Sequence, residues 1–279
     1  MTITGAARLA GVMGWPVSHS RSPVLHNFWL NEYGIDGAYV PLKVTPEAFE
    51  RSFGTLASLG FGGVNVTVPH KEATFAAVDQ TDELAKRIGA VNTVVFDEDG
   101  QAHGSNTDAF GFVEGLRSRL PGWSGSAGPA VVLGAGGAAR AIVAALQDEG
   151  APEIRVVNRT EARGKQLVEE FGTPLSSVIW EQRSDALDGA AIVVNTTTLG
   201  MVGKPPLNLA LDNLPEYAVV NDIVYTPMMT PLLTAAAARG NPIVDGLEML
   251  LHQARPGFAL WFGTEPEVTD RLRAAVLGD

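Results

Sequence analysis

A glycine-rich turn is the segment of this 279-residue chain that most plainly suggests chemistry. The residues Gly134, Ala135, Gly136, Gly137 and Ala138 follow a short apolar run and open an alanine-rich stretch that extends to residue 149. Gly134 permits a tight turn, and Gly136 lets the backbone approach a pyrophosphate, which the amides at the helix start then face. The turn predicts a dinucleotide site, with an ordinary strand-to-helix turn as the alternative.

The end of the next predicted strand indicates which dinucleotide would bind. Proteins specific for NAD usually place an acid there, to accept a hydrogen bond from the ribose 2'-hydroxyl. This chain instead has Asn158, Arg159 and Thr160, with Arg163 four residues after Arg159. Two guanidinium groups one helical turn apart can bracket a 2'-phosphate. The pattern favours NADP over NAD, the alternative being two solvated arginines at a helix start.

Four polar clusters occupy the N-terminal part of the chain, at residues 14–23, 65–71, 90–93 and 106–108. Hydroxyls and amides ahead of a helix, as in the first cluster, suit a carboxylate. In the second cluster Asn65 and Thr67 leave one face of a strand, and Lys71 begins a helix. Each cluster alone fits turn or capping chemistry. Together they are typical of a site for a polyol.

These residues must be positioned by alternating short strands and helices, the order found in parallel sheets. The predicted strands are 9–13, 38–41, 63–66, 91–96, 130–133, 154–157, 191–194, 219–223 and 243–244. The predicted helices are 24–33, 46–59, 110–120, 138–149, 161–170, 231–239 and 247–262. The glycine- and proline-containing stretch 121–129 is linker-like and precedes the dinucleotide unit. We therefore expect two α/β domains, as the chain length also favours.

Composition excludes several other classes of protein. The formal net charge of −11 disfavours sequence-independent binding to nucleic acid, and the 46% hydrophobic content contains no stretch fit to span a membrane. The chain has no cysteine and no export-type N-terminus, so we expect a cytoplasmic location. The five histidines lack metal-ligand spacing, and no metal is expected. Ser18 beside His19 lacks the elbow motif of a hydrolase.

The sequence resembles the shikimate dehydrogenase family over nearly its whole length. The motifs, in the order and spacing of that family, are SHSRSP, NVTVPHK, GAVNT, NTD, GAGGAAR, NRTEAR, NTTTLGM, DIVYTPMMTP and DGLEMLLHQA. The resemblance implies a substrate-binding catalytic domain at 1–108 plus 246–279 and a Rossmann-like NADP-binding domain at 109–245. It also implies reversible reduction of 3-dehydroshikimate by NADPH, a step of aromatic amino acid biosynthesis.

The resemblance further implies roles for single residues. Lys71 and Asp108 would form the catalytic pair. The residues around the substrate would be Ser18, Ser20, Asn65, Thr67, Asn92, Tyr225 and Gln253. Hydride arriving at a ring carbonyl leaves negative charge on oxygen, so a cation there stabilises that charge and can supply the proton. On the cofactor side, Thr196, Thr197, Ile223 and Gly246 would join the glycine turn and Arg159 with Arg163.

Two departures from the family pattern lie beside Asp108. Ser105 stands where many relatives have an acid, and Ala109 replaces a glycine. A sister enzyme acting on quinate or aminoshikimate is therefore an alternative. A non-catalytic metabolite or nucleotide sensor of the same fold is the alternative from another class. For partners we expect a small-molecule substrate, no nucleic acid or membrane, and a monomer or homodimer.

Overall fold

The structure is a computed structural model that describes residues 3–278. The chain folds into two compact units, residues 1–107 with 251–279 and residues 108–250. The described strands are β1 (Arg8–Gly14), β2 (Gly37–Lys43), β3 (Phe61–Val66), β4 (Gln80–Thr81), β5 (Thr93–Phe96), β6 (Ala102–Ser105), β7 (Ala130–Leu133), β8 (Ile154–Asn158), β9 (Leu175–Ile179), β10 (Ile192–Asn195), β11 (Val219–Asp222) and β12 (Ile243–Val244). The α-helices are α1 (Ser22–Glu32), α2 (Phe49–Phe53), α3 (Lys71–Ala77), α4 (Glu83–Ile88), α5 (Asp108–Arg119), α6 (Gly137–Asp148), α7 (Glu161–Phe171), α8 (Pro231–Ala238), α9 (Gly246–Phe262) and α10 (Asp270–Leu277).

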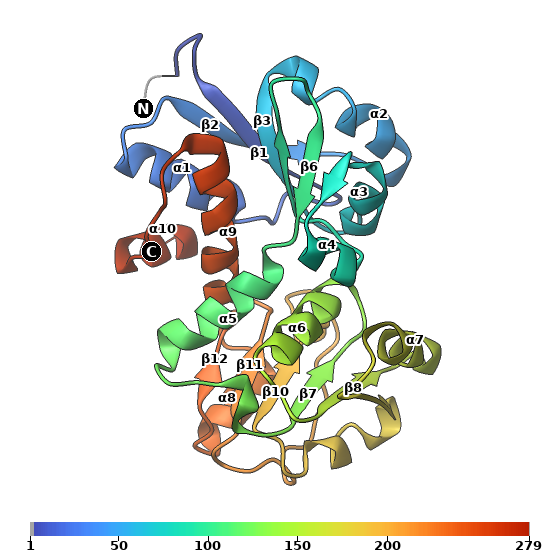
Figure 1. The fold of residues 1–279 in the computed structure, drawn as a ribbon. Helices are drawn as coiled ribbons and strands as arrows, with labels where there is room; N and C mark the ends of the chain where they lie inside the picture. Colours follow the sequence, from blue (N-terminus) through green and yellow to red (C-terminus); the bar gives the residue numbers. More distant parts are fainter. Residues whose placement is uncertain (1–2, 279) are drawn as a thin grey trace. The chain divides into compact units, whose positions relative to one another are not determined.

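The sheet of the second unit has the strand order β12-β11-β10-β7-β8-β9, and every pairing is parallel. Numbered from β7, this is the order of the classical dinucleotide-binding sheet, with its switch point between β7 and β10. One face of the sheet packs Val131 and Leu133 of β7 against α8 in a common core. Helices α6 and α7 connect β7, β8 and β9 (Figure 1). The expected Rossmann-like domain is confirmed.

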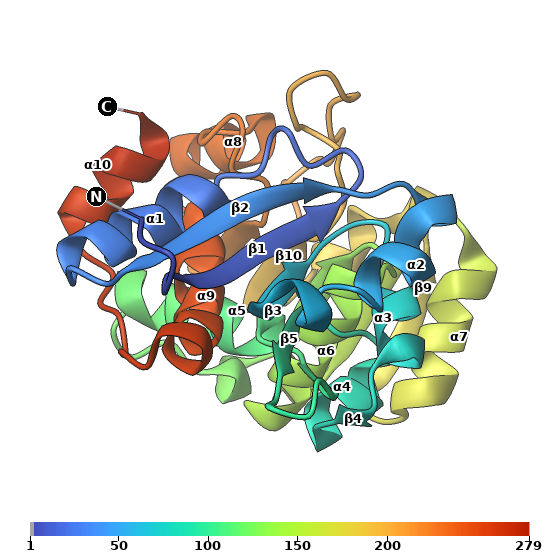
Figure 2. The ribbon, with the colours of Figure 1, turned by 90° about the horizontal axis from the view of Figure 1, so that it is seen from above.

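The sheet of the first unit, in contrast, is mixed, with the order β2-β1-β3-β5-β6-β4. The β1 strand is parallel to β2 and β3, whereas β5 is antiparallel to both β3 and β6. A uniformly parallel sheet was therefore the wrong expectation here. The reason is the short turn at 97–101 between β5 and β6, since a hairpin connection makes its two strands antiparallel. Helices α1 and α10 lie side by side in this unit (Figure 2).

The predicted helix 46–59 is also wrong. The segment forms two 3-10 turns, Pro46–Ala48 and Ala57–Leu59, on either side of the short α2. Gly54 ends α2, and glycine is a poor helix former. Phe49, Phe53 and Leu56 nevertheless point into the core of the first unit. The apolar side chains of this segment thus face the core as in the predicted helix, although its backbone does not form one continuous α-helix.

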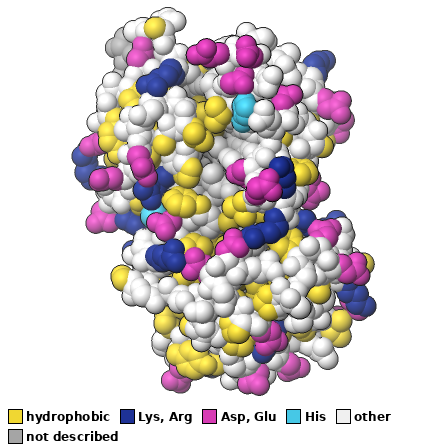
Figure 3. All heavy atoms as spheres, viewed as in Figure 1, with side chains coloured by type: hydrophobic (Ala, Val, Ile, Leu, Met, Phe, Trp, Pro, Cys, Tyr) yellow, Lys and Arg dark blue, Asp and Glu magenta, His cyan; other side chains and the backbone are white. Residues whose placement is uncertain are grey.

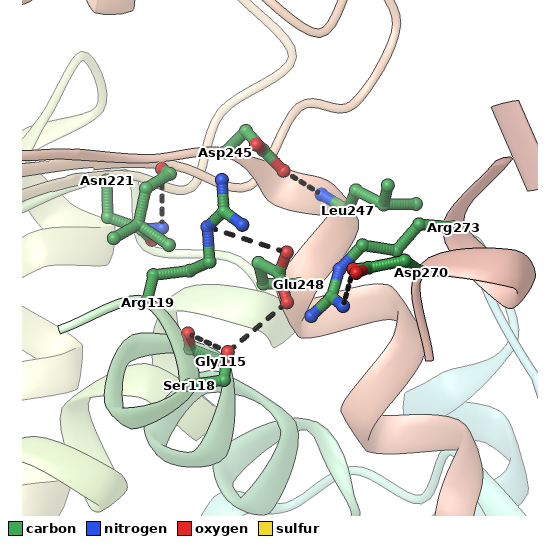
Figure 4. Close-up of polar contacts among 10 residues, drawn as sticks. Gly115, Ser118, Arg119, Asn221, Asp245, Leu247, Glu248, Asp270 and Arg273 are labelled. Atoms are coloured by element: carbon green, nitrogen blue, oxygen red, sulfur yellow. Dashed lines mark hydrogen bonds and ion pairs between the residues drawn. The ribbon is translucent and has the colours of Figure 1, made fainter. Parts of the chain in front are cut away.

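Helices α5 and α9 approach closely within the second unit (Figure 4). A Cβ added at Gly115 of α5 would lie 3.1 Å from the backbone of Glu248, so a larger residue there would require the two helices to move slightly apart. The carboxylate of Glu248 is buried; it accepts from Ser118 Oγ at 3.2 Å and lies 3.8 Å from Arg119 Nε. At the start of α9, Asp245 Oδ1 accepts from the Leu247 amide at 3.0 Å, and burial raises the pKa of Asp245.

In the first unit, the last part of α9 is fastened to the sheet. The indole of Trp261 donates to Val94 O at 2.9 Å, and a Cβ at Gly63 would collide with that indole. Glycine is therefore required at position 63 by the close approach of the ring. Trp261 also belongs to an aromatic cluster around His26. In this cluster the ring of Tyr39 stacks on the imidazole of His26 at a centroid distance of 3.9 Å.

Replacement of His26 is expected to reduce the fall in the free energy of unfolding that accompanies a decrease in pH. Burial lowers the pKa of His26 to about 3, compared with 6.5 in an unfolded chain. Between pH 6.5 and pH 3 the unfolded state therefore binds a proton at this histidine, whereas the folded state does not. The contribution of neutral His26 to the free energy of unfolding is fully present above pH 6.5 and is lost as the pH falls toward 3. Between pH 7 and pH 4 we expect wild type to lose about 3 kcal/mol more than His26→Phe in urea unfolding.

The exposed His19 in the same unit supplies the control, since His19→Gln should change the pH dependence by less than about 0.5 kcal/mol. Any packing cost of the phenylalanine is the same at both pH values and cancels in the comparison. Parallel stability curves for wild type and His26→Phe would contradict the prediction.

The charged side chains on the face viewed in Figure 3 show no single-sign patch, since acids and bases are interspersed on both units. In the described part of the chain, no helix is long and apolar enough to cross a membrane. The same residues contain no group of three or more His, Asp or Glu side chains placed to hold a metal ion.

Candidate active site

The polar clusters of the N-terminal part meet at one edge of the first sheet. Because β1 and β3 are parallel, their carboxyl ends lie together there. The antiparallel β5 brings its amino end to the same edge, where Asn65 pairs with Thr93 in register. Thr93 in turn pairs with Ser105 at the carboxyl end of β6. Segments 14–23, 65–71, 90–93 and 106–108 are therefore all anchored at this edge.

Asn65 is held by three side-chain hydrogen bonds. Its Oδ1 accepts from the Tyr39 hydroxyl at 2.6 Å. Its Nδ2 donates to Asn92 O at 3.2 Å and to Thr93 Oγ1 at 3.1 Å. Burial raises the pKa of Tyr39, so this phenol stays protonated and can act as the donor. Both amide protons of Asn65 are thereby engaged, which fixes the orientation of its amide group.

Asn92 links this strand edge to two other segments. Its Oδ1 accepts from the Thr107 amide at 2.8 Å, and its Nδ2 donates to Thr107 Oγ1 at 3.1 Å. Gln253 of α9 lies at the limit of hydrogen bonding, with Oε1 3.5 Å from both Asn92 Nδ2 and Thr107 Oγ1. The structure thus brings the predicted residues Asn65, Asn92 and Gln253 into one connected polar cluster.

Two further predicted residues lie next to this cluster. Lys71 is the first residue of α3, and its carbonyl accepts from the amide of Val91, the neighbour of Asn92. Thr67 follows β3, and its methyl group lies against Gly14, where an added Cβ would come within 2.5 Å of it. Glycine at 14 therefore lets the loop after β1 pass beside Thr67.

The remaining predicted substrate and catalytic residues lie in the loop after β1 and in the second unit. Ser18 is exposed, and Ser20 is half-buried with its Oγ accepting from the Ser22 amide at 3.3 Å. Tyr225 is half-buried in the second unit. Asp108 is the buried first residue of α5, also in the second unit, and follows Thr107 directly in the chain.

In the second unit, the glycine turn has the geometry that a dinucleotide requires. Gly134 has φ +113°, a conformation that side chains rarely tolerate, and an added Cβ would lie 2.4 Å from Thr196 Oγ1. Gly136 is extended and exposed, with no atom within 4 Å of the place of a Cβ. Ala139 is fully buried where α6 meets the sheet. Ala135, Gly137 and Ala138 complete the turn, which leaves open space at the N-terminus of α6 for a pyrophosphate.

The two predicted 2'-phosphate ligands lie at the end of β8 and the start of α7. Arg159 and Arg163 are both exposed, and neither forms an ion pair with any residue from 3 to 278. Lys165 on the same helix, in contrast, is paired with Glu161 at 2.7 Å. Asn158 Nδ2 donates to Thr160 O at 2.9 Å and thereby shapes the turn that carries Arg159. The guanidinium groups of these two arginines are therefore available to bind the phosphate of a ligand.

The residues predicted at the nicotinamide end lie after β10, after β11 and at the start of α9. Thr196 Oγ1 donates to Leu133 O at 2.6 Å, which fixes it beside the glycine turn. Thr197 Oγ1 donates to Asn195 Oδ1 at 2.7 Å. A Cβ added at Gly246 would lie 2.2 Å from Ile223 O, so these two predicted residues are in close backbone contact.

Several residues of these networks were missed from sequence. Tyr39, Thr93 and Thr107 hold the amides of the first cluster, and Asn195 and Asp222 hold the loops of the second. Thr93, Thr107, Asn195 and Asp222 stand inside the motifs GAVNT, NTD, NTTTLGM and DIVYTPMMTP. Tyr39 stands in an ordinary strand pattern and gave no signal.

Comparison with known proteins gives three family matches along the chain. They are a shikimate dehydrogenase substrate binding domain at residues 12–94, a shikimate / quinate 5-dehydrogenase domain at 121–202 and a shikimate 5'-dehydrogenase C-terminal domain at 246–277. A curated shikimate dehydrogenase (NADP(+)) of Paramagnetospirillum magneticum is 60% identical, covering 99% of this chain and 100% of its own.

Two solved structures are also similar over nearly the whole chain. The quinate dehydrogenase of Corynebacterium glutamicum in complex with NAD has a TM-score of 0.90 at 31% identity, covering 98% of this chain and 99% of its own. The shikimate 5-dehydrogenase of Thermus thermophilus in complex with NADP(H) and shikimate has a TM-score of 0.86 at 39% identity, covering 96% and 98%. Relatives that use either substrate therefore share this fold.

Proposed function

The chain belongs to the shikimate dehydrogenase family, and on that premise we propose that it interconverts shikimate and 3-dehydroshikimate with NADP. In the oxidative direction a hydride passes from the ring carbon of shikimate to NADP⁺ and the hydroxyl proton is released, giving 3-dehydroshikimate and NADPH. The observation that carries the choice of cofactor is the exposed pair Arg159 and Arg163, which no acid of the described chain neutralises.

Substrate binding is assigned to residues 1–108 with 246–279, and cofactor binding to 109–245. The support for the first assignment is the cluster of Asn65, Asn92 and Gln253, whose orientations are fixed by hydrogen bonds. Thr67 and the hydroxyls of Ser18 and Ser20 are assigned to the same substrate, as is Tyr225. A site built from oriented amides and hydroxyls rejects analogues that lack the ring hydroxyls, since its own groups would lose their partners.

Lys71 and Asp108 are the proposed catalytic pair. The ammonium of Lys71 stabilises the negative charge that develops on the carbonyl oxygen during reduction, and it can deliver the proton there. Asp108 accepts a hydrogen bond from a neighbouring ring hydroxyl and holds the ammonium. Thr107 supports this assignment, because its amide is fixed to Asn92 Oδ1 one peptide before Asp108.

On the cofactor side, NADP when bound supplies the hydride acceptor and, reduced, the hydride donor. The amides at the N-terminus of α6 bind its pyrophosphate, and Gly134 and Gly136 make room for it. Arg159 and Arg163 bind the 2'-phosphate, helped by Asn158 and Thr160. Thr196, Thr197, Ile223 and Gly246 line the nicotinamide half.

A matrix of initial rates, shikimate or quinate against NADP⁺ or NAD⁺, tests the function. We expect shikimate with NADP⁺ to give the highest kcat/KM, because both phosphate-binding arginines and the oriented amides then have partners. A higher kcat/KM with quinate would select the sister activity, for which Ser105 and Ala109 are the motivation. Binding without turnover in all four combinations would indicate a sensor and contradict the proposal.

The proposed setting is the cytoplasm, in the biosynthesis of aromatic amino acids through chorismate. The proposed partner is the small-molecule substrate, with the protein acting as a monomer or homodimer. The net charge of −11 disfavours a nucleic-acid partner, because binding to a phosphate backbone relies on clustered basic side chains.

A further inference from the structure

A buried carboxylate holds the loops at the carboxyl ends of β10 and β11. Asp222 is the last residue of β11 and is fully buried. Its Oδ1 accepts from Asn195 Nδ2 at 2.9 Å and from the Val224 amide at 3.1 Å. Its Oδ2 accepts from Thr230 Oγ1 at 2.7 Å. Three donors from three different segments therefore converge on one side chain.

Asn195 extends this network to the loop after β10. Its Oδ1 accepts from both the amide and the hydroxyl of Thr197, at 3.1 and 2.7 Å. Its Nδ2 also donates to Leu199 O at 3.2 Å. Thr196, which lies between Asn195 and Thr197, donates its hydroxyl proton to Leu133 O. The loop is thus attached on one side to Asp222 and on the other to the end of β7, directly before the glycine turn.

Thr230 extends the network to a helix start. Its hydroxyl accepts from the Leu233 amide at 3.3 Å and so caps α8, which leaves its single proton for Asp222. Among residues 3–278 no Lys or Arg is ion-paired with this carboxylate, and burial raises the pKa of Asp222 to about 6. Because a buried charge is costly, the three hydrogen bonds are what stabilises the ionised form of this side chain.

We propose that Asp222 is a positioning residue for the nicotinamide half of the cofactor, acting through Asn195 and the Val224 amide on the loops that carry Thr196, Thr197 and Ile223. The inference rests on the proposed function, because it assumes that these loops meet the nicotinamide half. An asparagine at position 222 cannot accept from all three donors, since one of its two polar atoms is itself a donor. At least one of the three hydrogen bonds is then lost or reversed in direction, and the charge that strengthens all three is removed.

The test compares two ligands by calorimetry on the full chain. NADP⁺ contacts both halves of the site, whereas adenosine 2',5'-bisphosphate has the 2'-phosphate half and lacks nicotinamide. For Asp222→Asn we expect the Kd of NADP⁺ to rise about tenfold and the Kd of the bisphosphate to stay within about twofold. Thr230→Val removes one donor at the far end of the network and should change NADP⁺ binding in the same direction by about threefold.

Asn221→Ala is the matched control. Asn221 is the neighbouring buried polar residue of β11, and its Nδ2 donates to Val244 O of the adjacent strand β12 at 2.9 Å. We expect this variant to melt at a lower temperature and to bind both ligands as wild type does. Equal weakening of both ligands by Asp222→Asn and by Thr230→Val would overturn the inference, as would selective weakening of NADP⁺ by Asn221→Ala.

The same experiment separates this inference from the function on which it rests. Failure of wild type to oxidise shikimate would contradict the proposed function, while the selective change in NADP⁺ binding would still support the role of Asp222. Normal turnover with no selective change in NADP⁺ binding would leave the function standing and overturn the role of Asp222.

Discussion

Replacement of Lys71 by methionine is expected to lower kcat for shikimate oxidation by about three orders of magnitude. Methionine retains an unbranched side chain of similar length and removes the ammonium, so the developing charge on oxygen loses its stabilising cation and the proton loses its carrier. The affinity for NADP⁺, measured by calorimetry, should stay within about twofold, because no cofactor role is assigned to Lys71. A loss concentrated in kcat identifies an interaction made in the transition state.

Lys86 provides the control for this variant. It lies on α4 in the same unit and is ion-paired with Glu83 at 2.6 Å on the surface. Lys86→Met should leave kcat within about twofold of wild type, since exposed pairs contribute little. Equal turnover by Lys71→Met and wild type would refute the catalytic assignment of Lys71.

Lys71→Arg distinguishes the two ways in which the ammonium can act. Arginine keeps the positive charge but is effectively never deprotonated in proteins. If Lys71 mainly polarises the carbonyl, Lys71→Arg should retain much more activity than Lys71→Met. If Lys71 transfers the proton, the two variants should be similarly inactive across the pH range tested.

Most of the dinucleotide unit could be predicted closely because its information is local, although its strand β9 was not predicted. Strand β7 ends at Leu133 as expected, and α6 begins at Gly137, one residue before the predicted start. The glycine turn lies between them with the positive φ at Gly134 that its sequence requires. Buried parallel strands are continuous apolar runs, and such runs are easily recognised.

The first sheet was harder to predict because its strands carry weaker patterns. Strand β6 has the sequence Ala-His-Gly-Ser, with no apolar alternation, and was missed entirely. Strand β5 was predicted from residue 91 and begins at Thr93, because Ala90, Val91 and Asn92 form the approach to the strand. Without β6 the antiparallel hairpin could not be recognised, and the sheet was taken to be parallel.

The supporting residues could not be predicted because they depend on tertiary contacts. Tyr39 and Asn65 are 26 positions apart in sequence, and Asn195 and Asp222 are 27 apart. Motifs identify which side chains face a ligand, but they do not indicate which distant residue fixes the orientation of an amide. Those orientations follow from strand register, which sequence patterns specify only where a face is uniformly buried.

Removal of Arg159 and Arg163 together is expected to abolish the preference for NADP⁺. Hydrogen bonds to a charged group contribute about 1.5–3 kcal/mol, so each arginine corresponds to roughly a 10- to 100-fold change in the KM for NADP⁺. The KM for NAD⁺, which lacks the 2'-phosphate, should stay within about threefold in the double variant Arg159→Ala/Arg163→Ala. The measurement is kcat/KM for both nucleotides at fixed, saturating shikimate.

Lys165→Ala is the control, because Lys165 is an exposed cation on the same helix whose charge is already paired with Glu161. Its removal should leave both KM values unchanged within about twofold. The wild-type KM for NADP⁺ should also rise with salt, while the KM of the double variant should respond less, since screening weakens exposed charge pairs. Equal losses for NADP⁺ and NAD⁺ would mean that the arginines hold the α7 turn rather than the 2'-phosphate, and the cofactor preference would then need another source in the chain.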